Sequence, residues 1–188
     1  MTPAPAARDK RGDLTNAAQA LFYEQGFGAT TLANVAERAG VPLGNVYYYF
    51  KTKDSLVEAI LMERRAAFDA MVAQWDAIQK PKARLEAFLD MNHSGREIVA
   101  EHGCPVGGLS MELGKEHSIL GDKAAAVLAR YLEWTTAQFR AMGRDDADDL
   151  GLRLMSSLQG AMLMANSFRQ PELITREVNR ARAWLNDL

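Results

Sequence analysis

The sequence predicts an all-α protein. Apolar residues recur three or four positions apart through almost the whole chain, which places them on one face of an α-helix. No stretch alternates β-branched or aromatic residues with polar ones, as a half-buried strand does. With 188 residues, 48% of them hydrophobic, the chain can bury a core of its own. We expect about nine helices.

Three short helices are predicted in the first fifty residues. An apolar stripe runs from Leu14 to Phe22, and Gly26 after it suits a left-handed C-terminal cap. A second helix covers about residues 32–39. The third begins at Pro42, where the missing N–H of proline costs nothing, and ends near residue 48.

A tight turn joins the second helix to the third. Only Gly40, Val41 and Pro42 separate them. Two short helices joined in this way form a helix-turn-helix, in which the second helix enters the major groove of DNA. An ordinary helical hairpin in a bundle has the same spacing, so spacing alone leaves both interpretations open.

The remaining residues predict six further helices. Proline or glycine separates most of them, and Pro171 stands where the last one starts. The expected ranges are 53–75, 85–101, 109–113, 122–142, 148–168 and 171–185.

Composition favours a soluble cytoplasmic protein with no membrane partner. No stretch approaches the 18 or so apolar residues of a membrane span, no signal peptide is recognisable, and a single cysteine excludes an internal disulfide. The formal net charge is −2, and the first 55 residues hold six Lys or Arg against five Asp or Glu. Charge therefore adds little support for nucleic-acid binding.

The N-terminal region resembles the TetR family of transcriptional regulators. The resemblance is strong over residues 10–60 and extends further only in length, helical content and helix order. It rests on residues 17–31, on residues 35–41, and on the segment like that family's recognition helix: Gly44-Asn45-Val46-Tyr47-Tyr48-Tyr49-Phe50-Lys51-Thr52-Lys53-Asp54-Ser55-Leu56. The resemblance implies a regulator that binds operator DNA through this helix.

By this resemblance, nine residues are candidate DNA contacts: Thr30, Thr31, Leu43, Gly44, Asn45, Tyr47, Tyr48, Tyr49 and Lys53. The two threonines, Tyr49 and Lys53 would meet phosphates. The segment from Leu43 to Asn45 would face the bases, where Asn45 can hydrogen-bond adenine and Leu43 can touch a thymine methyl group. Helix capping by the threonines, packing of the tyrosines and a solvated Lys53 are the structural alternatives.

The region after residue 55 is expected to sense a ligand. The resemblance implies an effector pocket, and methionine and aromatic side chains suit an apolar or aromatic molecule. Cys104 lies in a glycine-rich loop that also occurs in some relatives that respond to electrophiles or oxidants. Plain core packing is the alternative for each candidate: Met62, Phe68, Met91, Cys104, Met111, Tyr131 and Trp134.

Small residues on the last two expected helices predict a close helix contact. In TetR relatives the corresponding helices form a homodimer interface, and a two-fold dimer predicts a palindromic operator. A helix pair packed within one chain is the competing interpretation. The candidate interface residues are Ser157, Gly160, Ala161, Ala165, Val178, Ala181 and Leu185.

The expected function is a ligand-responsive repressor, released from its operator when a small apolar or reactive molecule acts on the C-terminal region. The expected domains are a flexible tail (1–9), a helix-turn-helix domain (10–54) and a sensing and dimerisation domain (55–188). We find no catalytic motif, metal-ligand spacing or glycine-rich phosphate loop, and so expect no enzyme, metal or cofactor. A small helical enzyme or an architectural DNA-binding protein is the alternative.

Overall fold

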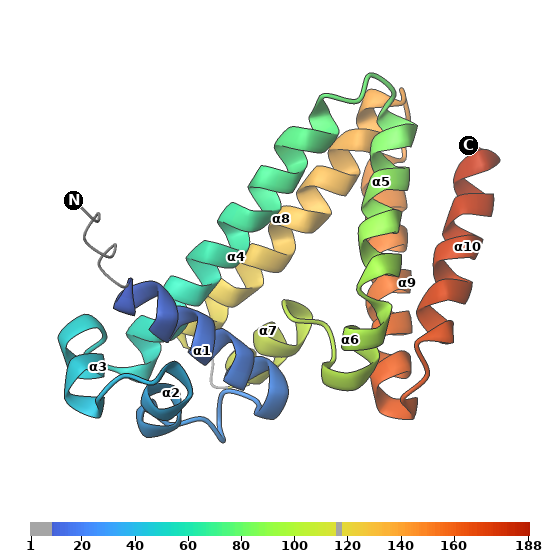
Figure 1. Ribbon diagram of the computed structural model, residues 1–188. Helices are drawn as coiled ribbons and strands as arrows, with labels where there is room; N and C mark the ends of the chain where they lie inside the picture. Colours follow the sequence, from blue (N-terminus) through green and yellow to red (C-terminus); the bar gives the residue numbers. More distant parts are fainter. Residues whose placement is uncertain (1–8, 116–117) are drawn as a thin grey trace, which may run out of the picture. The chain divides into compact units, whose positions relative to one another are not determined.

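The computed structural model describes residues 9–115 and 118–188, and ten helices lie in these two ranges (Figure 1). These residues form no strand, and the all-α prediction is confirmed. The predicted flexible tail lies outside the described residues except for Asp9. The helices are α1 (Lys10–Gln25), α2 (Leu32–Ala39), α3 (Leu43–Tyr49), α4 (Lys53–Asp76), α5 (Pro81–Ser94), α6 (Arg96–His102), α7 (Gly107–Gly114), α8 (Ile119–Ala141), α9 (Ala147–Phe168) and α10 (Glu172–Asn186).

The additional helix arises because the expected helix at 85–101 is divided in two. Gly95 has φ −86° and ψ 1°, which ends α5 and starts α6. The first of these helices also begins earlier than its apolar residues indicate, at Pro81. None of the helices in the described ranges combines the length and hydropathy that a membrane span requires.

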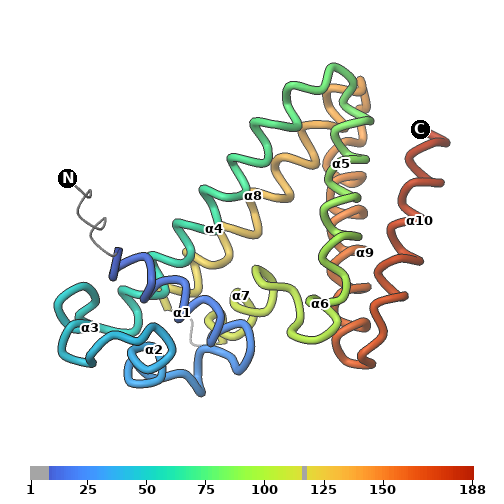
Figure 2. The backbone as a smooth tube through the Cα atoms, in the orientation of Figure 1, coloured from blue at the N-terminus to red at the C-terminus, as the bar shows by residue number. Residues whose placement is uncertain are grey.

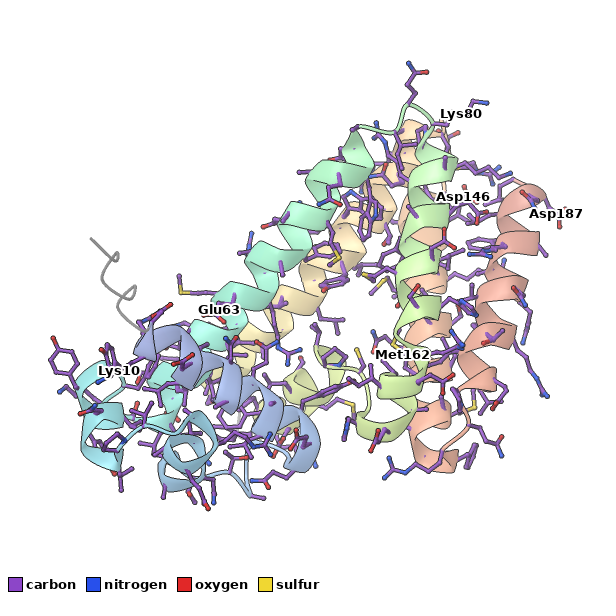
Figure 3. All side chains as sticks on the ribbon, viewed as in Figure 1. Lys10, Glu63, Lys80, Asp146, Met162 and Asp187 are labelled. Atoms are coloured by element: carbon purple, nitrogen blue, oxygen red, sulfur yellow. The ribbon has the colours of Figure 1, made fainter. Side chains whose placement is uncertain are left out.

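The chain divides into two compact units, and the division falls within α4. The first unit ends at Met62, and the second begins at Glu63, which is labelled in Figure 3. The sequence placed this boundary eight residues earlier, after residue 54. The first turns of α4 belong to the first unit because they bury Leu56, Val57 and Ile60 completely.

The second unit has a continuous apolar core. Helix α10 packs against both α5 and α9, as Figure 1 shows, and Met162 of α9, labelled in Figure 3, is one of the core residues. Helices α8 and α9 come very close at Gly151, where a Cβ atom would lie 2.2 Å from Oγ1 of Thr136. Glycine is therefore required at this crossing, because any larger residue would overlap α8.

Candidate functional site

The turn between α2 and α3 has the geometry of a helix-turn-helix. Helix α2 ends at Ala39 and α3 begins at Leu43, and the path of the turn can be followed in Figure 2. Gly40 has φ 62°, a left-handed conformation, and the N–H of Val41 donates to the carbonyl of Ala36 at 3.0 Å. This hydrogen bond and the left-handed Gly40 end α2 abruptly and turn the chain into α3.

Burial decides which face of α3 is free. Val46 is fully buried and Phe50, which follows the helix, is 2% exposed. On the other side, Leu43 is 41%, Tyr47 48% and Tyr48 76% exposed. Large apolar side chains are thus left in solvent on the helix that the sequence assigns to the DNA interface.

The other residues expected on α3 have less favourable positions. Asn45 is half-buried. Tyr49 is 36% exposed and its ring contacts Tyr48 edge to face, with centroids 4.9 Å apart. By the angular step of about 100° per residue, Asn45 and Tyr49 project away from the side that carries Leu43 and Tyr47. Gly44 is exposed, and a Cβ atom there would meet nothing within 4 Å.

The two threonines have different roles. Thr31 is exposed and caps α2: its Oγ1 accepts from the N–H of Asn34, whose side chain accepts from the N–H of Thr31. Thr30 is completely buried, and its hydroxyl donates to the carbonyl of Gly26 at 2.8 Å. Thr30 therefore does not fit the expected phosphate contact, because its side chain holds the loop between α1 and α2 together.

Lys53 is bound within the protein. Its Nζ donates to the carbonyls of Phe27 at 2.9 Å and Thr30 at 3.1 Å, and lies 3.9 Å from the centre of the Phe27 ring. These contacts connect the start of α4 to the loop between α1 and α2. Two of the three N–H donors of the ammonium group are thereby used. Lys51, by contrast, is exposed beside the end of α3.

Five aromatic residues form a cluster in the second unit. Phe68 and Tyr131 stack with ring centroids 3.6 Å apart, and Trp75 lies 5.0 Å from Trp134. Phe88 of α5 lies 5.8 Å from Trp134. We call Phe68, Trp75, Phe88, Tyr131 and Trp134 the aromatic cluster. Phe88 was not among the residues that the sequence predicted for the ligand pocket, although it stands on an apolar helix face.

Polar groups border the aromatic cluster. Burial raises the pKa of Tyr131 to about 12, and the nearby Cys104 adds to this shift. Cys104 is half-buried in the loop between α6 and α7, where its Sγ accepts from the N–H of Gly107 at 3.3 Å and from Nε2 of Gln159 at 3.5 Å. The thiol therefore lies close to the aromatic cluster and beside two N–H donors.

The remaining ligand candidates divide into two groups. Met91 packs against the same core as the aromatic cluster. Met62 and Met111 are 73% and 66% exposed and do not belong to that core. Neither can line an enclosed pocket together with Phe68 and Trp134. Methionine content alone did not distinguish these positions.

Most of the expected dimer contacts are internal to the chain. Burial is almost complete for five of them: Ala161, Ala165, Val178, Ala181 and Leu185. They pack α9 against α10 and its neighbours, which is the alternative that the small-residue pattern left open, and they cannot reach a second subunit. Ser157 and Gly160 are half-buried. The apolar residues that α9 exposes are Leu152, Leu163, Met164 and Phe168.

Comparison with known proteins agrees with this architecture. Residues 14–60 match the model for bacterial regulatory proteins of the tetR family, and residues 81–177 match the model for the C-terminal domain of LmrA/YxaF-like transcriptional regulators. Both models describe transcriptional regulators. The chain belongs to the TetR family.

Two relatives from pseudomonads and mycobacteria each match part of this chain. The regulator TtgR of Pseudomonas putida is 44% identical over 55 residues, which are 29% of this chain and 26% of that protein. The repressor KstR2 of Mycobacterium tuberculosis is 32% identical over 98 residues, 52% of this chain and 48% of that protein. The alignments thus span less than half the length of these two relatives.

The fold likeness extends over nearly the whole chain. The crystal structure of SCO4454, a TetR-family transcriptional regulator from Streptomyces coelicolor, superposes with a TM-score of 0.82. The superposition covers 95% of each chain at 19% sequence identity. At this identity the likeness establishes the fold.

If Lys53 has a structural role, its removal should destabilise the fold without changing the contacts to DNA phosphates. Lys53→Met retains the alkyl chain over Phe27 but removes the charge. We expect it to lower the free energy of unfolding by about 1.5 kcal/mol, the lower end for hydrogen bonds to charged groups, because Lys53 is half-exposed. Urea unfolding followed by far-ultraviolet circular dichroism, which reports the helices of both units, measures this loss.

The matched control is Lys51→Met. We expect this change to reduce the slope of log K for DNA against log salt concentration by about 0.9, the value for one phosphate contact. Lys53→Met should leave that slope unchanged. A reduction of about 0.9 for Lys53→Met would show that its ammonium group contacts DNA after all.

Proposed function

We propose that the protein is a ligand-responsive repressor that binds a palindromic operator as a homodimer. The observation that carries the proposal is the exposed face of α3, where Leu43, Tyr47 and Tyr48 lie in solvent on a helix held in place by Val46 and Phe50. Membership of the TetR family and the likeness to the repressor KstR2 support repression. Thr31 and Lys51, both exposed, are the proposed phosphate contacts.

Operator binding can be tested without knowing the operator. Duplexes that bind the full chain are selected from a randomised DNA library, and their affinities are measured by fluorescence anisotropy. Tyr48→Ala should bind the selected duplex about tenfold more weakly, as for the loss of one base or backbone contact. Because Tyr48 is 76% exposed, its removal should leave the fold intact.

Met111→Ala is the control, since Met111 is 66% exposed on α7 of the other unit. It should bind like the parent. Selection of no duplex, or equal affinity of the parent and Tyr48→Ala, would contradict the proposal that α3 binds DNA.

The outer face of α9 is the proposed dimer surface. Leu152 and Leu163, which are eleven residues apart and so lie on one side of α9, are each more than half exposed, and Met164 beside Leu163 is 47% exposed. An open groove of about 370 Å³ lies beside Leu152, and residues of α7, α8 and α9 such as Ser110 and Leu132 line it. Association of two such faces would remove this apolar surface from water, which is the main force in protein association.

Leu163→Asp tests this surface. A carboxylate at the centre of an apolar interface would be buried without a partner, so we expect the variant to sediment as a monomer at concentrations where the parent is a dimer. Ile119→Asp, at a side chain 76% exposed on α8, should remain dimeric. A monomeric parent, or a Leu163→Asp variant as dimeric as the parent, would contradict the assignment.

The proposed effector site includes the aromatic cluster and Cys104. Buried aromatic rings suit an apolar or aromatic molecule, and the sulfur, with two N–H donors beside it, suits addition to an electrophile. The proposed effect is a lower affinity for the operator, which requires that the effector bind the released state more tightly than the DNA-bound state.

The contribution of Cys104 is tested with benzoquinone. Addition forms one bond between Sγ and a ring carbon, and the thiol proton ends on the hydroquinone product. We expect benzoquinone to release the parent from the selected duplex but not Cys104→Ser, with Met111→Ala released like the parent. Equal release of Cys104→Ser and the parent would exclude the thiol as the sensing group.

A further inference from the structure

Four residues of α3 form a continuous exposed surface. Leu43 and Tyr47 are four residues apart, as are Gly44 and Tyr48, so the two pairs lie side by side along one face of the helix. Val46 is buried on the other side. We call Leu43, Gly44, Tyr47 and Tyr48 the α3 strip.

The α3 strip lacks the groups that read guanine and adenine by paired hydrogen bonds. Guanine is read most often by Arg or Lys, and adenine by Asn or Gln. The strip holds none of these residue types, and Asn45, next to Tyr48 at the edge of the strip, is half-buried. Hydrogen-bond donors and acceptors are limited to the tyrosine hydroxyls.

The chemistry that the strip does offer is apolar contact. Leu43 presents only carbon and hydrogen, and it is 41% exposed at the N-terminal end of the helix. In the major groove the apolar feature of a base pair is the C5-methyl group of thymine. Gly44, beside Leu43, has open space where a Cβ atom would stand, so the helix backbone can approach a base edge closely.

We propose that the α3 strip recognises operator half-sites through the C5-methyl groups of thymine. This inference rests on the proposed function, in which α3 lies in the major groove. Leu43 makes the central methyl contact, and Tyr47, four residues on, extends the apolar surface toward the next base pair. Phosphate contacts from Thr31 and Lys51 position the helix without selecting the sequence.

The experiment removes the methyl groups one at a time. In the duplex selected from the randomised library, each thymine is replaced in turn by deoxyuridine, which lacks the C5-methyl group and keeps every base-pairing atom. We expect affinity to fall about fourfold at each contacted thymine, the value of one buried methyl group, and to stay unchanged elsewhere. Fluorescence anisotropy with the full-length chain measures each affinity.

Leu43→Ala identifies the side chain responsible. At the thymine that Leu43 contacts, this variant should bind the thymine and deoxyuridine duplexes equally, while Met111→Ala discriminates between them as the parent does. Because Leu43 is partly exposed and Val46 retains the inward contact, the variant keeps the core of this unit.

The outcomes separate this inference from the proposed function. If duplexes are selected but no deoxyuridine substitution weakens binding, the operator function stands and methyl recognition is overturned. If Leu43→Ala still discriminates at every position, the assignment to Leu43 is overturned. If no duplex is selected, both the proposed function and the inference that rests on it fail.

Discussion

The shortness of α3 is the constraint on which the DNA-binding unit depends. A helix of seven residues is not stable in water by itself, and α3 has no side chain that caps its N-terminus. Its position is therefore set from outside, by Gly40 before it and by the burial of Val46 and Phe50. The Arg11 guanidinium, 5.1 Å from the centre of the Phe50 ring, covers the same anchor from α1. Fixing the inner face leaves the apolar outer face of α3 exposed to solvent.

The helices could be predicted from the sequence more completely than the loop contacts. The spacing of apolar residues predicted α2, α3 and the turn between them, because the apolar residues that the helices bury, such as Val35 and Val46, lie on one face of each helix. It carried no information on Thr30 and Thr31, which lie in a loop and differ only in which hydroxyl faces inward. The bonds from Lys53 to the same loop cross 23 and 26 residues, a separation that no local pattern reports.

Helix α9 shows why an apolar pattern can misassign an interface. Small residues at helical spacing favour close packing but do not identify the partner helix. Ala161 and Ala165 face the core of the same chain, whereas Leu163 and Met164 face outward. A helix with apolar residues on both faces satisfies the requirements of an internal contact and of an external one. Burial in the folded chain was needed to tell the two faces apart.

A few contacts between α4 and α8 hold the aromatic cluster, the proposed effector site, together. A ligand changes DNA affinity only by favouring one of two arrangements of the protein. Helix α4 supplies Phe68 and Trp75 to the cluster and Lys53 to the helix-turn-helix loop. Two polar contacts tie α4 to α8 beside the rings: Arg130 donates to Asp69 at 3.0 Å, and Trp134 donates to Asp76 at 3.4 Å. In the proposed effector site, a molecule that separated the rings would also have to lengthen these two bonds between α4 and α8.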